Sequence, residues 1–213
     1  MPGSGGDERT EPRPSPRNKR AEIVAVATKF FGENGYEDTK WADVATAVGL
    51  GPTALYHYFE SKQQCLFEIL VEAIEDAQAE FGRLSEGDFA DALEALLRGT
   101  FERDDREVCR ARVLVSEQGL VRHPREAPRE EEARVRAFAL VKEYEAGWRD
   151  FLAAGMDAGA IPRTDPELLA RALIGIHNSV WQWYRPEGRL GLEDVSAFYV
   201  PRMLGIAGLR PIV

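Results

Sequence analysis

The residues best suited to chemistry are four outward positions, two short groups and two large polar ones: Pro52, Thr53, Tyr56 and His57. A threonine hydroxyl or methyl can touch a base edge or a thymine methyl, whereas the tips of tyrosine and histidine can reach phosphate oxygens. Lys62 follows a few residues later, where a cation is suited to clamp a phosphate. The residue types therefore predict DNA contact from one exposed face. For His57, a solvated histidine is the open alternative.

The elements that must position this face are two short helices within Trp41–Lys62, joined by a tight turn. Ala45 is small where the helices would cross, Gly49 tolerates a positive φ in the turn, and Pro52 fits the first turn of the second helix. The large inward positions are Val44, Val48, Leu50, Leu55 and Tyr58. This combination predicts a helix-turn-helix whose second helix enters a DNA major groove. An ordinary helical hairpin inside a core is the alternative.

The formal charge of −9 suits a DNA-binding protein only when the chain is divided. Residues 1–64 hold 8 Lys and Arg against 9 Asp and Glu, and the remainder holds 19 against 27, so most of the excess acid is C-terminal. The cations Arg13, Arg17, Lys19 and Arg20 are uninterrupted by any acid. Phosphate contact requires such local positive charge. The expected DNA-contacting set therefore also includes Arg17, Lys19, Thr39 and Lys40.

The stretch from Arg20 to Phe67 resembles the DNA-binding domain of TetR-type transcriptional repressors. The positions that carry the resemblance are Ala27, Phe30, Phe31, Gly35, Tyr36, Thr39, Asp43, Val44, Ala45, Ala47, Gly49, Leu55, Tyr56, Phe59, Ser61 and Lys62. Two positions depart from the pattern, because Trp41 replaces an aliphatic residue and Ala42 a residue that is often polar or charged. The resemblance implies a repressor that a small molecule releases from its operator.

Helical spacing continues to the end of the chain without strand alternation, so the expected fold is all-α. We expect a disordered tail over residues 1–16, a DNA-binding helix-turn-helix domain over 17–64, and a ligand-binding and dimerisation domain over 65–213. Helices are expected over residues 17–34, from Ser61 through Phe81, and over 89–101, 108–121, 130–154, 166–184 and 192–207.

Four local predictions concern helix ends. Thr39 is expected to cap the helix that follows it, and its hydroxyl could instead or also reach a phosphate. Ser61 and Gln64 match a capping box, and Asp165 is expected to cap the helix that begins at Pro166. The run Glu130–Glu132 is interpreted as a solvated acidic face in the first turns of a long helix.

The helix expected over residues 166–184 has two apolar or aromatic sides, and such a helix must bury both. One side carries Leu169, Leu173, Ile176, Val180 and Trp183, which we assign to the interface with a second copy of the chain. The other side carries His177, Trp181 and Tyr184, and Asn178 lies between turns. We assign a ligand site to His177, Asn178, Trp181, Arg185 and Arg189. A dimer also suits DNA reading, since one recognition helix reads a half-site. TetR-type repressors dimerise through their last two long helices.

The segment from Trp181 to Pro186 has a WYRP-type ending that resembles TetR-type repressors with acyl-CoA effectors. The resemblance implies an acyl-CoA thioester of a catabolic pathway as the effector. In the structural alternative, the aromatic rings belong to the dimer core and Arg185 is a helix-end cation. A multidrug-type sensor of hydrophobic compounds is the competing function. Acids inside the pocket would favour the drug sensor, and arginines at its mouth would favour acyl-CoA.

No catalytic or metal-binding pattern emerges from the remaining residues. His57, His123 and His177 have no metal-ligand spacing with Cys65 or Cys109, and no glycine-rich phosphate loop follows a strand. We therefore expect no cofactor, no metal and no enzymatic activity, with a small all-α enzyme as the alternative from another class. With no signal segment and no apolar run of ~20 residues, we expect a cytoplasmic protein without a membrane partner. Both cysteines are then expected to be reduced.

Overall fold

The computed structural model describes residues 16–209, which form helices and connecting loops without a strand. The elements are α1 (Pro16–Asn34), α2 (Trp41–Ala47), η1 (Pro52–His57), α3 (Lys62–Leu84), α4 (Phe89–Gly99), α5 (Asp105–Glu117), η2 (Gln118–Arg122), α6 (Pro128–Asp157), α7 (Pro166–Trp183) and α8 (Leu192–Ile206). The all-α prediction is confirmed. The predicted tail lies outside the described residues except for Pro16, which opens α1. Within the described part, no helix is long and apolar enough to span a membrane.

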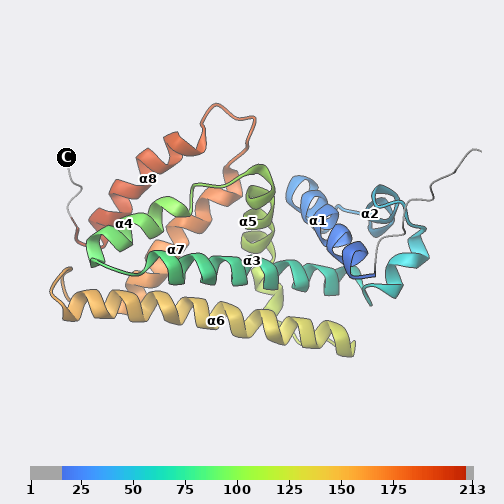
Figure 1. Cartoon of the computed structure of the whole chain (residues 1–213), viewed down its shortest axis with the longest axis horizontal. Coiled ribbons are helices and arrows are strands. Elements are labelled where there is room, and N and C mark those ends of the chain that lie inside the picture. The colour runs from blue at the N-terminus through green and yellow to red at the C-terminus, as the bar shows by residue number, and fades with distance from the viewer. Residues whose placement is uncertain (1–15, 210–213) are drawn as a thin grey trace, which may run out of the picture.

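Two long helices, α3 and α6, lie side by side along the molecule (Figure 1). α1, α2 and η1 gather at one end of this pair, and α4, α7 and α8 gather at the other. α5 crosses between them and packs against both α1 and α7. This arrangement joins the predicted DNA-reading end to the predicted ligand-binding end through three helices.

Each end has its own apolar core. The first core holds residues of α1, α2 and η1 together with the first turns of α3, and it also receives Val113 from α5 and Ala133 from α6. The second core is built from α4, the end of α6, α7 and α8. The boundary predicted after residue 64 falls in the first turn of α3, whose Cys65 and Leu66 are fully buried in the first core. The division into 17–64 and 65–213 stays a prediction.

The helix-turn-helix forms for the reasons that its sequence indicates. Val44, Ala45 and Leu55 are fully buried. Gly49 has a φ of 67°, a left-handed conformation that suits glycine, and the Leu50 N–H donates to the Ala45 carbonyl at 2.8 Å. Small, positive-φ and apolar positions therefore occur where the turn requires them.

The helix caps agree with the predictions only in part. Asp165 accepts hydrogen bonds from the N–H groups of Glu167 and Leu168, as predicted. Ser61 accepts from the Gln64 N–H at 2.9 Å, but the Gln64 side chain accepts from Glu60 rather than from Ser61, so half of the capping box forms. The prediction that Thr39 caps α2 is wrong, because the N-cap residue is Lys40.

The acidic run at the start of α6 is not the solvated face that its sequence suggested. Glu130 is buried, with 8% of its surface exposed. Glu131 accepts two hydrogen bonds from Arg134, and these bonds lower the pKa of Glu131 to about 2. Only Glu132 is exposed as predicted. Glu130 is paired with Ser61 and Arg125 from outside α6, and Glu131 with Arg134 of the same helix, so their partners account for the difference.

Candidate DNA-reading segment and ligand cavity

The predicted DNA-contacting face lies on η1, a 3-10 helix of six residues that we call the reading segment. Its side chains at Pro52, Thr53, Tyr56 and His57 are exposed, and Tyr56 leaves 56% of its surface open. Leu55 is fully buried in the opposite direction. The segment therefore exposes the hydroxyl of Thr53 and the polar ends of Tyr56 and His57, while buried Leu55 anchors it to the core.

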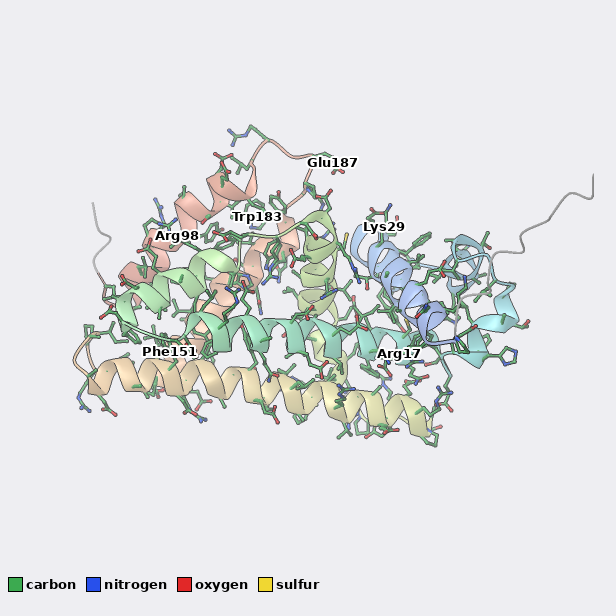
Figure 2. The ribbon with its side chains drawn as sticks, in the orientation of Figure 1. Arg17, Lys29, Arg98, Phe151, Trp183 and Glu187 are labelled. Atoms are coloured by element: carbon green, nitrogen blue, oxygen red, sulfur yellow. The ribbon has the colours of Figure 1, made fainter. Side chains whose placement is uncertain are left out.

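Two of the predicted cations at the DNA-reading end, Arg17 and Lys40, are exposed. Arg17 lies in the first turn of α1, and Figure 2 labels it there, while Lys40 precedes α2. Lys19 has an internal role, because its ammonium group donates to the Val48 carbonyl at 2.6 Å and to Glu22 at 2.9 Å. Lys19 therefore braces the helix-turn-helix against α1, and its predicted phosphate contact stays a prediction.

Thr39 also has a structural place. It is 4% exposed, and its hydroxyl lies 2.8 Å from the Gly35 carbonyl and 3.1 Å from the Phe30 carbonyl. A buried hydroxyl that already has acceptors has nothing to offer a phosphate. The predicted DNA contact of Thr39 is thus replaced by a role in closing the loop between α1 and α2.

Lys62 makes a structural contact within the chain and can also contact a DNA phosphate. Its ammonium group donates to the Tyr36 carbonyl and lies 4.1 Å from the centre of the Tyr36 ring. Partial burial lowers its pKa, against the opposing effect of Glu37. An ammonium group has three donors, so those not used by Tyr36 can still meet a phosphate. The phosphate clamp stays a prediction.

At the other end, helices α3 to α8 surround a cavity of about 90 Å³, which we call the apolar cavity. Its walls include Leu97, Tyr144, Trp148 and Leu173 together with three predicted ligand residues, His177, Asn178 and Trp181. One water needs roughly 10–15 Å³ on the same measure, so the cavity as it stands accommodates a small group.

His177 is a neutral imidazole in this wall. The Trp181 indole N–H donates to Nε2 of His177 at 2.9 Å, so that nitrogen carries no proton. Burial lowers the pKa of His177 to about 4, and the positive charge of Arg103 acts in the same direction. His177 and Trp181 therefore present an uncharged, aromatic surface to the apolar cavity.

Charged side chains also belong to the wall of the apolar cavity, and four of them form ion pairs. Arg103 pairs with Glu80 at 3.3 Å, and Arg110 pairs with Asp76. Glu107 accepts from the Asp104 backbone at 2.8 Å. The lining of the apolar cavity therefore contains two guanidinium groups and three carboxylates, and two of these carboxylates are paired with the arginines.

The predicted ligand residues Arg185 and Arg189 are exposed and are not among the described side chains that line the apolar cavity. The Arg185 guanidinium donates to the carbonyls of Tyr184 at 2.8 Å and Gln182 at 3.4 Å. It therefore satisfies backbone acceptors at the end of α7, where a cation is favoured. This geometry matches the structural alternative for Arg185.

A second hollow adjoins the apolar cavity and was missed from the sequence. It measures about 520 Å³, lies among η2, α6 and α7, and shares Ile174 and Asn178 with the apolar cavity. Its charged lining consists of Arg122, Lys142, Arg149 and Arg171 with Glu145 and Glu167. We call it the cationic groove. No spacing pattern revealed it, because its cations come from three separate elements.

The predicted dimer face of α7 is corrected by its packing. Leu169, Leu173 and Val180 are buried in the chain's own second core. Ile176 packs against that core as well, and Trp183 alone of the five is largely exposed, at 44%. The exposed large apolar side chains of α7 and α8 are instead Leu168, Trp183, Phe198 and Ile206.

Comparison with known proteins matches both ends of the molecule to one family. Residues 23–69 match the model "Bacterial regulatory proteins, tetR family", and residues 106–206 match "Tetracyclin repressor-like, C-terminal domain". The chain belongs to the TetR family. This TetR-family protein is therefore a DNA-binding transcriptional repressor that responds to a ligand.

Relatives and solved structures span nearly the whole chain. The repressor KstR2 of Rhodococcus jostii is 28% identical over 193 residues, which cover 87% of this chain and 89% of the relative. The structure of the ketosteroid transcriptional regulator KstR2 of Mycobacterium tuberculosis superposes with a TM-score of 0.69 at 26% identity, covering 88% and 93% of the two chains. AibR, solved with isovaleryl coenzyme A and operator DNA, has a TM-score of 0.72 over 87% and 97%, and at 21% identity it shares the fold.

Proposed function

We propose that this repressor acts as a homodimer that leaves its operator when a CoA thioester enters the apolar cavity. The observation that carries the proposal is the junction of two spaces at Ile174 and Asn178, one apolar and one lined by four cations. An acyl-CoA has the same two-part character, with an apolar acyl group and a phosphate-bearing nucleotide.

The DNA contacts follow from the exposed face of the reading segment. Thr53 meets base edges, Tyr56 and His57 meet phosphates, and the exposed cations Arg17 and Lys40 add backbone contacts. A single reading segment covers one half-site, so two copies are needed to hold an operator.

Helices α7 and α8 supply the contact between the two copies. Leu168, Trp183, Phe198 and Ile206 leave between 44% and 65% of their surfaces exposed in the single chain. An exposed apolar group of this kind on two adjacent helices is suited to pair with its own copy across a two-fold axis. The dimer helices therefore stay those expected from the sequence, while the face of α7 changes.

The effector class is supported by the WYRP-type ending of α7. The chain is also similar over most of its length to KstR2 repressors, one of which is a ketosteroid transcriptional regulator. With a net charge of −9, this chain attracts a polyanion only where cations are concentrated. The cationic groove beside the apolar cavity is lined by four cations and two acids. Lys142, Arg149 and Arg171 form ion pairs with neighbouring carboxylates, which a phosphate would replace. Three of the four cations are arginines, whose forked donors suit phosphate.

Release from DNA requires only that the ligand prefer a different spacing of the two reading segments. A tenfold preference corresponds to about 1.4 kcal/mol. The apolar cavity must enlarge for a bulky acyl group, and an enlargement that displaces α5 or α6 would change this spacing, because both helices also pack into the first core.

A multidrug-type sensor is the second candidate, and the paired acids favour it. Asp76 and Glu80 lie in the wall of the apolar cavity, where a hydrophobic cation could displace Arg110 or Arg103 from them. This function requires no polyanion site, so it predicts that the cationic groove is dispensable for release.

Fluorescence anisotropy on a labelled operator duplex tests the proposal. The duplex is selected with the wild-type protein, and release is measured with isovaleryl-, octanoyl- and phenylacetyl-CoA and with the matching free acids. We expect a CoA thioester, and not its free acid, to release the wild type. Arg149→Ala should need about tenfold more thioester, whereas Arg185→Ala should behave as the wild type. Release by hydrophobic cations alone, or equal release of wild type and Arg149→Ala, would contradict the acyl-CoA proposal.

A further inference from the structure

The start of α6 is capped by a residue from the DNA-reading end. The residue before this helix is Ala127, which has no polar side chain to accept from the free N–H groups of the first turn. The Glu60 carboxylate does so instead, accepting from the N–H of Arg129 at 3.2 Å and of Glu130 at 3.3 Å. A negative charge at a helix N-terminus is also favoured by the helix dipole. Glu60 therefore caps a helix that begins 68 residues after it in the sequence.

A second contact runs in the opposite direction. The Ser61 hydroxyl donates to the Glu130 carboxylate at 2.7 Å, and Arg125 lies 3.7 Å from the other carboxylate oxygen. Glu130 is 8% exposed, and a buried carboxylate is costly unless it keeps such partners. Each side thus places one carboxylate among donors of the other side.

These contacts lie directly behind the reading segment. Glu60 and Ser61 follow His57 by three and four residues, and Ser61 is the N-cap of α3. The Arg129 guanidinium lies 3.4 Å from the Tyr58 carbonyl, between the reading segment and Glu60. From this junction α6 continues without a break to Tyr144 and Trp148, which form part of the wall of the apolar cavity.

We propose that Glu60, Ser61 and Glu130 form a polar clamp that positions the reading segment on α6 and couples DNA binding to the start of that helix. All three are positioning residues and need not touch DNA. The chain already connects the two ends through α3, and the clamp adds a non-covalent connection to a second helix of the cavity wall. Because coupling between two sites is reciprocal, a change at α6 that alters DNA affinity implies that DNA alters α6.

Reciprocity permits a test that needs no effector. Hydrogen exchange is measured in the full chain, with and without saturating operator duplex, for the amides at the start of α6, including Arg129 and Glu130. In the wild type, we expect DNA to slow this exchange about tenfold. In Glu60→Ala the protection should be lost, and in Glu60→Gln it should be partly kept, because the amide oxygen can accept but carries no charge.

Two further variants separate the clamp from general packing. Ser61→Ala removes the second contact and should reduce the protection about threefold. Glu75→Gln breaks a surface ion pair between α3 and Arg136 of α6, away from the reading segment, and should leave the protection intact. Unchanged exchange on DNA binding in the wild type, or full protection in a folded Glu60→Ala protein, would overturn the clamp. Neither outcome depends on the identity of the effector, so it leaves the acyl-CoA proposal untouched.

Discussion

The two ends of the molecule differ in how well the sequence predicts which side chains are exposed. In the reading segment, Leu55 is buried and Tyr56 is exposed, as the pattern predicts. In α7, Leu173 and Val180 were assigned to a partner and are buried within the chain. The reading segment has one apolar side, so burial has a single solution. α7 has two, and the packing of the other helices buries residues of both sides, Val180 and Trp181 among them, within the same chain.

The largest expected effect comes from a charge on the misassigned side of α7. Val180 is fully buried in the second core, and a buried unpaired charge costs about 3–5 kcal/mol. We expect Val180→Glu to lower the thermal midpoint sharply or to prevent folding, as measured by circular dichroism. Gln182→Glu, at an exposed position of the same helix, is the control. A stable, folded Val180→Glu monomer would restore the original interface assignment.

The next effect concerns His177, whose pKa falls to about 4 in the folded chain from 6.5. Between pH 6.5 and 4, the imidazole of His177 is protonated in the unfolded chain but not in the folded chain. The contribution of neutral His177 to the free energy of unfolding is therefore fully present above pH 6.5 and is lost as the pH falls toward 4. Between pH 7 and 5, the linkage amounts to about 2 kcal/mol. Urea unfolding at the two pH values should show this loss in the wild type. His177→Gln, which keeps an acceptor for Trp181, should lack it.

A charge on the exposed side of α7 and α8 should have a smaller effect on folding and a large one on assembly. Phe198 is 52% exposed in the single chain, so Phe198→Glu should fold with a thermal midpoint near that of the wild-type chain. Sedimentation should show monomers, and operator affinity should fall because the two half-sites are no longer held together. An intact Phe198→Glu dimer would refute this interface.

The smallest expected effects are those of substitutions in the reading segment on operator binding. Tyr56→Ala should weaken binding to all duplexes about equally and should flatten the salt dependence by about 0.9 in the logarithmic slope, because one phosphate contact is lost. Thr53→Val should instead change which operator sequence is preferred. Anisotropy at several salt concentrations measures both. A Tyr56→Ala protein with an unchanged slope would remove Tyr56 from the phosphate contacts.

Much of the fold followed from the sequence because its signals are local. Gly49, Pro52 and the Asp165 cap each act within a few residues, and all three lie where they were predicted. The failures have long-range causes. Thr39 is buried by a turn that brings it back to Phe30, and Glu130 is buried by residues some 70 positions earlier in the chain.

At the ligand-binding end, the sequence predicted the uncharged residues of the cavity wall but not the cations beside it. His177, Asn178 and Trp181 were found because they share one turn of helix, and they line the apolar cavity. Arg185 was chosen for its neighbours in the sequence, yet its guanidinium binds the carbonyls of its own helix end. The cations of the groove come from η2, α6 and α7, and no single-segment pattern could bring them together.

Native mass spectrometry of the operator complex tests the central claim most directly. The complex is titrated with the CoA thioester that is most active in the anisotropy assay. We predict an ion of two chains and one duplex that gives way to free duplex and a protein dimer carrying up to two thioesters. A complex that keeps its DNA with both thioesters bound, or a protein that binds no thioester at all, would contradict a repressor released by a CoA thioester.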